Sequence, residues 1–452
     1  MKNILLILIC FFLFTQLSYT QTRNTLWLGG LSQTSQGWGR TPEDLEQYYN
    51  YDLFNVISLQ GLDNTTYQPD LGIYGAAANI DIGNYPNVLG LGHDSGGLVL
   101  RAMANGSNNL TAIVLDGVPN LGSSAIGFAI NSDGSDGETQ AEFLIQGIKA
   151  IKADENCEDC DLVGSFEFWI NDMKANKELL SEMTSNSPVI NSLNQPENMP
   201  QIPYVVFWGS MEELSITTLM SSRFFPATGD ADQFTKCYAD ALSRAREDAN
   251  KEFAYSAIDN LSGFFNKAIG FVSKFFGDNP LSSPLQIIQS TAAFIETQRE
   301  EITSQLEAIR KRDQELARIL RCELANQLLA TEWQFALAEN GTFITEEVAN
   351  VPILDCLDCF DFDGEESWDD NYTSNCIDTD CINGVETVTV LIPESNDGLL
   401  NRSEQLLSGA AATYHLENTN HFQETKLEND FSDKIQELFD GGAGAAFVVN
   451  KQ

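Results

Sequence analysis

Short apolar, β-rich runs alternate along the first half of the chain with polar or mixed segments long enough for helices. The runs occupy Thr25–Leu28, Phe54–Leu59, Val88–Leu91, Thr111–Leu115, Tyr204–Trp208 and Thr387–Ile392. Strands that alternate with helices predict an α/β fold with a doubly wound, mostly parallel sheet. The regular spacing ends after Trp208, so a large insertion is expected before the last run.

The insertion, residues 216–350, has a mostly helical pattern. One long amphipathic run follows alternating steps of three and four residues through Ile302, Leu306, Ile309, Leu316 and Leu320. Such spacing is typical of a helix in a hairpin, and the stretch around Phe234 to Leu242 is the expected second half. In that arrangement Cys237 and Cys322 would face each other and form a disulfide.

Between these two stretches, Ile258 to Phe276 carries a wide aromatic face, on which Phe264, Phe271 and Phe275 extend the helical stripe. A face of this width needs a cover. Packing against the hairpin would provide one. The alternative is a lid, or a surface that meets lipid or a protein partner.

The first twenty residues have the pattern of a cleavable signal peptide. Lys2 precedes an apolar run from Ile4 to Phe14, and small residues stand at Ser18 and Thr20 before Gln21. The run is shorter than the roughly 20 apolar residues that span a bilayer, and no later run is longer. The sequence therefore predicts a secreted or periplasmic protein that is not an integral membrane protein.

Cysteine usage agrees with export. The chain has nine cysteines, and all except Cys10 follow the predicted leader. Disulfides are the expected state of cysteines outside the cytosol. The two CxxC pairs, Cys157/Cys160 and Cys356/Cys359, would favour a four-thiolate zinc site only in a reducing compartment.

Charge excludes one class of partner. The formal net charge is −40, with 65 acidic and 25 basic residues, so nucleic acid would be repelled. Acidic residues gather in a cysteine-rich loop at 351–385, where Asp361 and Asp363 precede Gly364. Oxygen ligands at alternate positions suit calcium, although a solvated loop pinned by disulfides explains the same pattern. No cofactor is required by the sequence.

The segment Val88–Met103 carries the strongest chemical signal. An apolar strand leads into the turn Gly92-His93-Asp94-Ser95-Gly96-Gly97 and then into a helix, which is the layout of a nucleophile elbow. The elbow needs residues without side chains two positions before and two after the nucleophile. Gly92 and Gly96 meet this requirement for Asp94, whereas Ser95 would have His93 at one of these positions.

These residues resemble the secreted, lipase-type branch of the α/β-hydrolases, whose elbow usually reads Gly-His-Ser-x-Gly-Gly. Further segments are similar to family motifs in the family's order: Thr25–Leu31, Ile113–Ser123, Ser187–Asn194, Tyr204–Gly209, Asn396–Leu400 and Asn420–Phe422. The resemblance covers about 24–210 and 386–440. It implies an α/β-hydrolase core at 21–215, with lid segments at about 124–200, and a second core part at 386–452.

By this resemblance Asp94 holds the nucleophile position, His421 is the general base and Asp397 orients His421. The backbone amides of Leu31 and Ser95 would form the oxyanion hole. His421 could instead be an ordinary loop histidine, and Asp397 could cap the following helix. Ser95 is the alternative nucleophile.

The family's ordinary substrates are small-molecule or lipid esters, but an aspartate at the elbow changes the chemistry. A carboxylate that attacks a saturated carbon forms an alkyl-enzyme ester, as in epoxide hydrolases and haloalkane dehalogenases, whose Gly-His-Asp-Trp-Gly-Gly elbow resembles Gly92–Gly97. Ser95 stands where those enzymes have tryptophan. The sequence thus leaves open an ester or lipid hydrolase, an aspartate-nucleophile hydrolase, and a catalytically silent binding protein.

Overall fold

The computed structural model describes most of the sheet-forming part of the chain. It covers residues 23–30, 38–57, 72–106, 109–131, 139–153, 155–157, 160–211, 215–224, 233–248, 314–337, 344–349, 385–390, 394–427 and 430–451. The predicted signal peptide, Leu31, the aromatic face at Ile258 to Phe276, and the acidic loop with Asp361 and Asp363 lie outside these residues.

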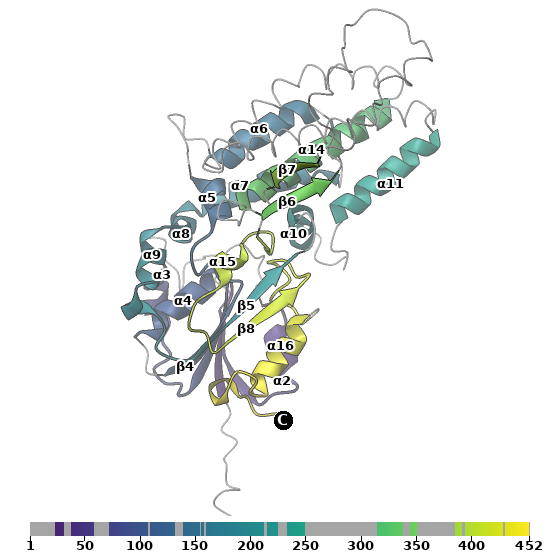
Figure 1. The fold of residues 1–452 in the computed structure, drawn as a ribbon. Helices are drawn as coiled ribbons and strands as arrows, with labels where there is room; N and C mark the ends of the chain where they lie inside the picture. Colours follow the sequence, from purple (N-terminus) through teal and green to yellow (C-terminus); the bar gives the residue numbers. More distant parts are fainter. Residues whose placement is uncertain are drawn as a thin grey trace, which may run out of the picture. The chain divides into compact units, whose positions relative to one another are not determined.

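Six strands form one sheet in the order β2-β1-β3-β4-β5-β8, and every neighbouring pair is parallel (Figure 1). The strands are β1 Arg23–Leu28, β2 Tyr51–Ile57, β3 Val88–His93, β4 Leu110–Asp116, β5 Tyr204–Ser210 and β8 Ala412–Glu417. The central strand β3 is buried along its whole length, as expected of a parallel strand covered on both faces. The predicted doubly wound α/β class is confirmed.

Helices precede and follow the strands. They are α2 Thr41–Glu46, α3 Gly72–Asn79, α4 Ser95–Ala104, α5 Ser124–Ile130, α6 Gln140–Lys152, α7 Leu162–Ala175, α8 Lys177–Glu182, α9 Pro188–Leu193, α15 Arg402–Gln405 and α16 Asp430–Phe439. Helices α5 to α9 occupy the region between β4 and β5, where lid segments are expected.

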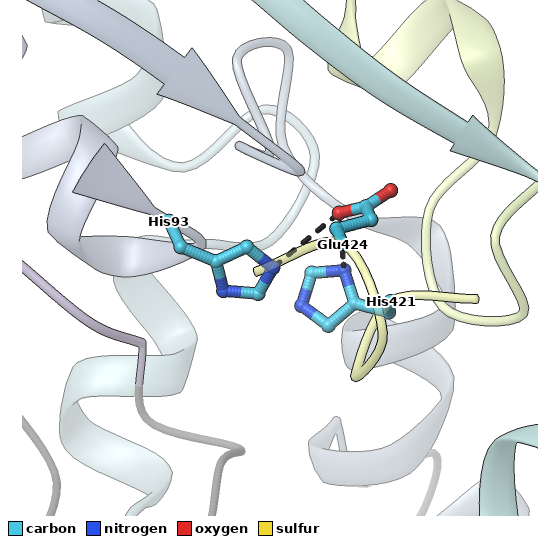
Figure 2. A group of neighbouring side chains, drawn as sticks. All are labelled: His93, His421 and Glu424. Atoms are coloured by element: carbon cyan, nitrogen blue, oxygen red, sulfur yellow. Dashed lines mark ion pairs between the residues drawn. The ribbon is translucent and has the colours of Figure 1, made fainter. Parts of the chain in front are cut away.

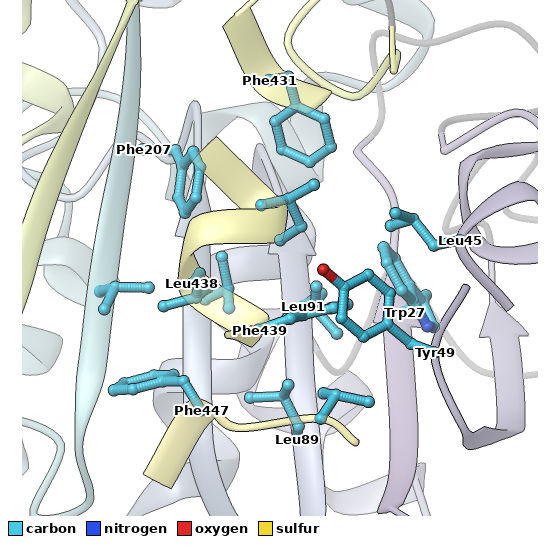
Figure 3. Close-up of a cluster of buried hydrophobic side chains, with 14 of the residues drawn as sticks. Trp27, Leu45, Tyr49, Leu89, Leu91, Phe207, Phe431, Leu438, Phe439 and Phe447 are labelled. Carbon is cyan, nitrogen blue, oxygen red and sulfur yellow. The ribbon is translucent and has the colours of Figure 1, made fainter. Parts of the chain in front are cut away.

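Alternation along β3 sorts its side chains between the two faces of the sheet. Leu89 and Leu91 point into an apolar cluster that also contains Phe431 and Phe439 of α16 (Figure 3). On the other face, Gly90 lets α4 lie close, because a Cβ there would come within 2.8 Å of the Leu100 side chain. The sheet therefore holds α4 tightly against β3, which fixes the turn that joins them.

The strand order reverses between β1 and β3. The chain leaves β1 toward β2 on one side, and β3 then lies on the other side of β1. Parallel sheets bind ligands outside the carboxyl ends of the strands where the winding reverses in this way. The residues that follow β1 and β3 are Gly29 and Asp94.

The last apolar run of the sequence pattern forms a strand in a different sheet. Strand β7, Val385–Val390, pairs antiparallel with β6, Ile344–Ala349, in a two-stranded ribbon. The last strand of the core is instead β8. The pattern indicates an extended segment correctly over residues 387–390, but a period of two does not say which strand will be its partner.

The chain divides into two compact units. The first comprises Met1–Ala141, Ser165–Gln233 and Ser395–Gln452, and contains the six-stranded sheet. The second comprises Glu142–Gly164 and Phe234–Glu394, with α11 Gln233–Asp248, α14 Gln314–Leu337 and the β6–β7 ribbon. Helix α10, Ser215–Phe224, belongs to the first unit. The predicted helical insertion is thus present in the structure.

Within the described residues, two disulfides stabilise the second unit, and they correct the predicted pairing of Cys237 with Cys322. Cys157 is bonded to Cys322 of α14, and Cys160 is bonded to Cys237 of α11. The CxxC turn, closed by a hydrogen bond from the Cys160 amide to the Cys157 carbonyl, therefore supplies one partner to each helix. Helical periodicity predicted two helices, but it carries no information on a third segment that pairs with both.

None of the helices in the described ranges is long and apolar enough to cross a membrane.

Candidate active site

Asp94 occupies the turn between β3 and α4 in a conformation that few side chains adopt. Its backbone has φ 52° and ψ −129°, outside the left-handed helical region as well as the ordinary ones. The turn is closed by a hydrogen bond from the Gly97 amide to the Asp94 carbonyl. A non-glycine residue in such a region costs about 1–3 kcal/mol, which the surrounding packing must offset.

Glycines around the turn leave no room for side chains. A Cβ at Gly92 would lie 2.7 Å from the Cα atom of Gly97, and one at Gly96 would lie 2.5 Å from the carbonyl oxygen of Leu28. Both are closer than real Cβ contacts. Gly92 and Gly96 are the residues two before and two after Asp94, so the backbone places Asp94 at the apex.

Ser95, the alternative nucleophile, is the first residue of α4 and is 1% exposed. Its hydroxyl has no hydrogen-bond partner among the described residues. Its backbone amide follows the apex directly, where the family resemblance expects an oxyanion donor. The second expected donor, the amide of Leu31, lies outside the described residues.

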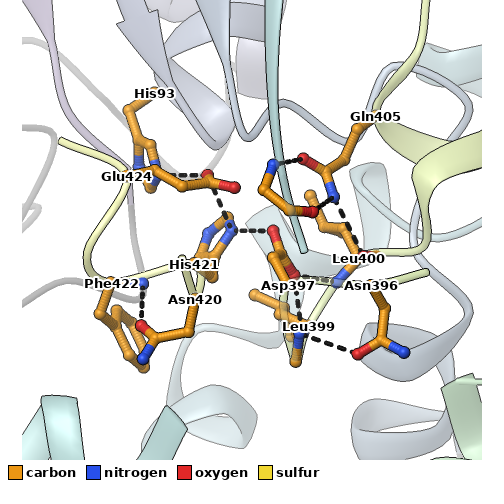
Figure 4. A network of polar contacts seen from close by, with 12 residues as sticks. His93, Asn396, Asp397, Leu399, Leu400, Gln405, Asn420, His421, Phe422 and Glu424 are labelled. Atoms are coloured by element: carbon orange, nitrogen blue, oxygen red, sulfur yellow. Dashed lines mark hydrogen bonds and ion pairs between the residues drawn. The ribbon is translucent and has the colours of Figure 1, made fainter. Parts of the chain in front are cut away.

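Asp397 and His421 meet through a hydrogen bond of 2.9 Å between Oδ2 and Nδ1 (Figure 4). The other carboxylate oxygen of Asp397 accepts hydrogen bonds from the amides of Leu399 and Leu400, at 2.8 and 2.6 Å. These bonds fix the carboxylate, so that it presents one oxygen to the imidazole. Helix α15 is capped by Asn401, and Asp397 therefore does not serve as its cap.

The order of the parallel strands matches a known architecture. In that architecture a tight turn follows a central strand, as at Asp94, and an acid–histidine pair comes later in the chain, as at Asp397 and His421. The fold is that of the α/β-hydrolases. In this fold the acid and the histidine come from turns that follow late strands, and here His421 lies four residues beyond the end of β8, Ala412–Glu417.

No family model and no curated protein matches the chain. Solved structures with similarity include a hydrolase from Oleispira antarctica, with 13% identity, a TM-score of 0.26, and coverage of 45% of this chain and 80% of that one. The peroxisomal α/β-hydrolase Lpx1 of Saccharomyces cerevisiae has 14% identity, a TM-score of 0.24, and coverage of 42% and 63%. The cell-wall-degrading esterase LipA of Xanthomonas oryzae has 15% identity, a TM-score of 0.19, and coverage of 48% and 77%. At these TM-scores the likenesses carry no argument about activity.

The electrostatic surroundings of His421 favour its protonated form. Burial alone would lower the pKa of His421, but the charge of Asp397 and the hydrogen bond to it outweigh burial. The charges of Asp94 and Asp116 act in the same direction, and the net pKa of His421 is raised. The elbow carboxylate of Asp94 therefore acts electrostatically on the imidazole of His421. His421 Nε2 has no hydrogen-bond partner among the described residues.

Three further titratable groups surround this pair, and the sequence pattern gave them no catalytic role. Asp116 ends β4; burial, with the charge of Asp397 added, raises its pKa to about 8, although His421 opposes the shift. Glu424 is fully buried, and burial raises its pKa well above the ordinary value. His93 ends β3, and burial and the charge of His421 lower its pKa. In the sequence, one signal pointed to these groups: Asp116 stands at the end of β4, the strand that pairs with the elbow strand β3.

Two histidines and one glutamate of the site lie close enough together to contact one metal ion. His93, His421 and Glu424 each offer a donor atom, and these atoms lie within 4.8 Å of one another (Figure 2). However, Nδ1 of His421 already contacts Asp397 at 2.9 Å, and a nitrogen that donates a proton to a carboxylate has no lone pair for a metal. The described geometry therefore favours an acid–base network over a metal centre.

Proposed function

We propose that this protein is an exported hydrolase in which Asp94 is the nucleophile and Asp397 and His421 activate water. The strained backbone at Asp94 is the observation that carries the proposal. Strained backbone conformations cluster at active sites, and an ionised carboxylate attacks without a base to remove its proton. Two disulfides support export, because such bonds persist outside the reducing cytosol.

The first step would be attack of an Asp94 carboxylate oxygen on a saturated carbon. The new bond is an ester C–O bond. A halide leaves with the electron pair of the broken bond, whereas an epoxide oxygen keeps that pair, stays attached through its other carbon and takes a proton from water. Attack on an ester carbonyl would give a reactive anhydride instead. Epoxides and alkyl halides are therefore the substrate class that fits an aspartate, even though the sequence motifs resemble those of ester hydrolases.

The second step would be hydrolysis of the alkyl-enzyme ester. Water adds to the carbonyl carbon of Asp94 while Nε2 of His421 takes its proton. The bond from that carbon to the alkyl oxygen then breaks, the alcohol leaves with the proton returned by His421, and the Asp94 carboxyl group loses its remaining proton to solvent. Asp397 would hold His421 in the tautomer that keeps Nε2 free, because it accepts the Nδ1 proton at 2.9 Å. The amide of Ser95 would stabilise the oxyanion.

A second candidate function is binding without catalysis. Asp94 is 1% exposed and His421 is 0% exposed, so a substrate must displace part of the cover to reach either. A hydrolase fold whose reactive groups stay covered could serve as a binding protein. This candidate predicts that no substrate class is turned over, and that loss of Asp94 changes no activity.

A substrate panel on five proteins separates the candidates. The panel contains p-nitrophenyl esters, epoxides and haloalkanes, and the proteins are the wild type, Asp94→Asn, Asp94→Ser, His421→Gln and the control His415→Gln. His415 is a suitable control because it lies on β8, stacked against Trp208 with the ring centroids 3.8 Å apart.

The wild type and His415→Gln should hydrolyse an epoxide or a haloalkane, and Asp94→Asn should not. Loss of the base should slow the second step by about 10²–10⁴-fold, so His421→Gln should accumulate an alkyl adduct on Asp94, seen by peptide mass. A silent wild type, with esterase activity gained in Asp94→Ser, would reject the proposal and favour the binding protein.

A further inference from the structure

Glu424 is enclosed by backbone on both sides of its carboxyl group. A Cβ at Gly117 would lie 1.9 Å from Oε2, and a Cβ at Gly209 would lie 2.1 Å from Oε1. Gly117 follows β4 and Gly209 belongs to β5, so the carboxyl group sits between the ends of two adjacent strands. The side chain is fully buried, and this cradle accepts a carboxyl group only if neither position carries a side chain.

The same carboxyl group contacts both histidines of the site (Figure 2). Oε2 lies 3.3 Å from Nε2 of His93 and 3.8 Å from Nδ1 of His421. Asp397 reaches the same Nδ1 from 2.9 Å. Glu424 therefore bridges two parts of the site. It contacts the elbow through His93, the residue before Asp94, and it contacts the Asp397–His421 pair through His421.

The charges around Glu424 show which form of the carboxyl group fits. Burial removes the water that would stabilise an anion, and the negative charges of Asp397 and Asp116 raise the pKa of Glu424 further. A hydrogen bond to Asp397 acts in the same direction, and the backbone of Gly209 opposes it only in part. His93 offers no compensating charge, because burial keeps its imidazole neutral. A neutral imidazole has one nitrogen that accepts a hydrogen bond, and Nε2 of His93 can accept one from a carboxylic acid O–H.

We propose that Glu424 is a positioning residue whose neutral carboxylic acid holds His93 of the elbow beside the Asp397–His421 pair. This inference rests on the proposed function and deepens it. A neutral Glu424 leaves Asp397 as the one anion, among the residues that the structure describes, that is bonded to His421, so that Asp397 orients the base. It also fixes the residue that immediately precedes the nucleophile.

The test uses Glu424→Gln, Glu424→Ala and the control Glu417→Gln. Glutamine keeps the shape and a hydrogen-bond donor but never ionises. Glu417 is a matched control because it lies on β8 with a side chain that is 73% exposed. Alanine removes the bridge.

The first measurement is the free energy of unfolding as a function of pH, which does not depend on catalysis. An acid whose pKa is raised in the folded state contributes stability that is complete below its unfolded pKa and is lost as the pH rises through the folded pKa. The wild type should therefore lose stability relative to Glu424→Gln as the pH rises above the ordinary glutamate value of 4.5. A wild type that gains stability over that interval would show an anionic Glu424 and overturn the proposal.

The second measurement is the titration of the imidazole nitrogens in protein labelled with ¹⁵N-histidine, since the chain has three histidines. Replacing a neutral acid by glutamine should leave the titration of His421 unchanged. Removing an anion so close to it would lower the pKa of His421 by about 1–3 units, which would contradict the proposal. This readout also remains if Glu424→Ala fails to fold.

The third measurement is the pH profile of kcat on the substrate found in the panel. Glu424→Ala should lose kcat with little change in KM, and Glu424→Gln should restore most of it with the wild-type profile. Loss in both variants would reject the positioning role. If no substrate is found, the proposed function fails while the first two measurements still decide the state of Glu424.

Discussion

The strain at Asp94 predicts an unusual order of stability between two simple variants. Glycine removes the Cβ atom that disfavours φ 52° and ψ −129°, whereas alanine keeps it and removes the carboxylate. Both variants lose the same charge, so their difference isolates the backbone. Relief of about 1–3 kcal/mol is offset by about 0.4–1 kcal/mol for the greater freedom of glycine in the unfolded chain. Asp94→Gly should therefore be more stable than Asp94→Ala by roughly 0.5–2 kcal/mol.

The neighbouring residue provides the control for this comparison. Ser95 is the first residue of α4, where glycine is ordinarily the poorer choice. Ser95→Ala should therefore be more stable than Ser95→Gly, the reverse of the order at position 94. Guanidinium unfolding, followed by circular dichroism and tryptophan fluorescence, measures all four variants. If alanine is the more stable replacement at both positions, the apex is not strained and the elbow assignment is refuted.

Three further predictions concern the close packing, the base and the second unit. Gly96→Ala should destabilise the protein by about 1–3 kcal/mol in thermal unfolding, because its Cβ would lie 2.5 Å from a β1 carbonyl oxygen. The control Gly127→Ala should be tolerated, because the nearest atom to its Cβ would be 3.4 Å away. Hydrolysis of the alkyl-enzyme should become faster as the pH rises through a pKa above the ordinary 6.5 of histidine, because His421 must be neutral to take a proton. A rate that does not change with pH in single-turnover experiments would contradict this. Replacing both Cys160 and Cys237 by serine should lower the free energy of unfolding of the second unit by about 2–5 kcal/mol, because their disulfide joins residues 77 positions apart. An unchanged melting temperature of that unit in calorimetry would contradict this.

The fold and the elbow could be predicted because local patterns determine them. A central strand buried on both faces leaves a continuous apolar run, and the tight turn after it demands glycines at fixed distances from its apex. Gly92 and Gly96 meet backbone at 2.7 and 2.5 Å, so their spacing records a steric requirement that is visible in the sequence. The order of elbow, acid turn and histidine turn likewise follows from the order of the strands.

The disulfide partners and the third carboxyl group of the site could not be predicted in this way. Helical periodicity places Cys237 and Cys322 on helices, but nothing in it indicates that the turn of Cys157 and Cys160 pairs with both. Glu424 looks like a solvated residue of a polar turn. In the fold it is buried, and two strand ends that are distant in sequence, at Gly117 and Gly209, converge on its carboxyl group.

The central claim is that Asp94 forms a covalent ester which water then cleaves at the Asp94 carbonyl. Single turnover in H₂¹⁸O, with enzyme in excess of the epoxide or haloalkane found in the panel, tests it most directly. The account predicts that the label enters the peptide that contains Asp94 and that the first product molecule carries none. Label in the product, with none in that peptide, would show direct attack of water and contradict the account.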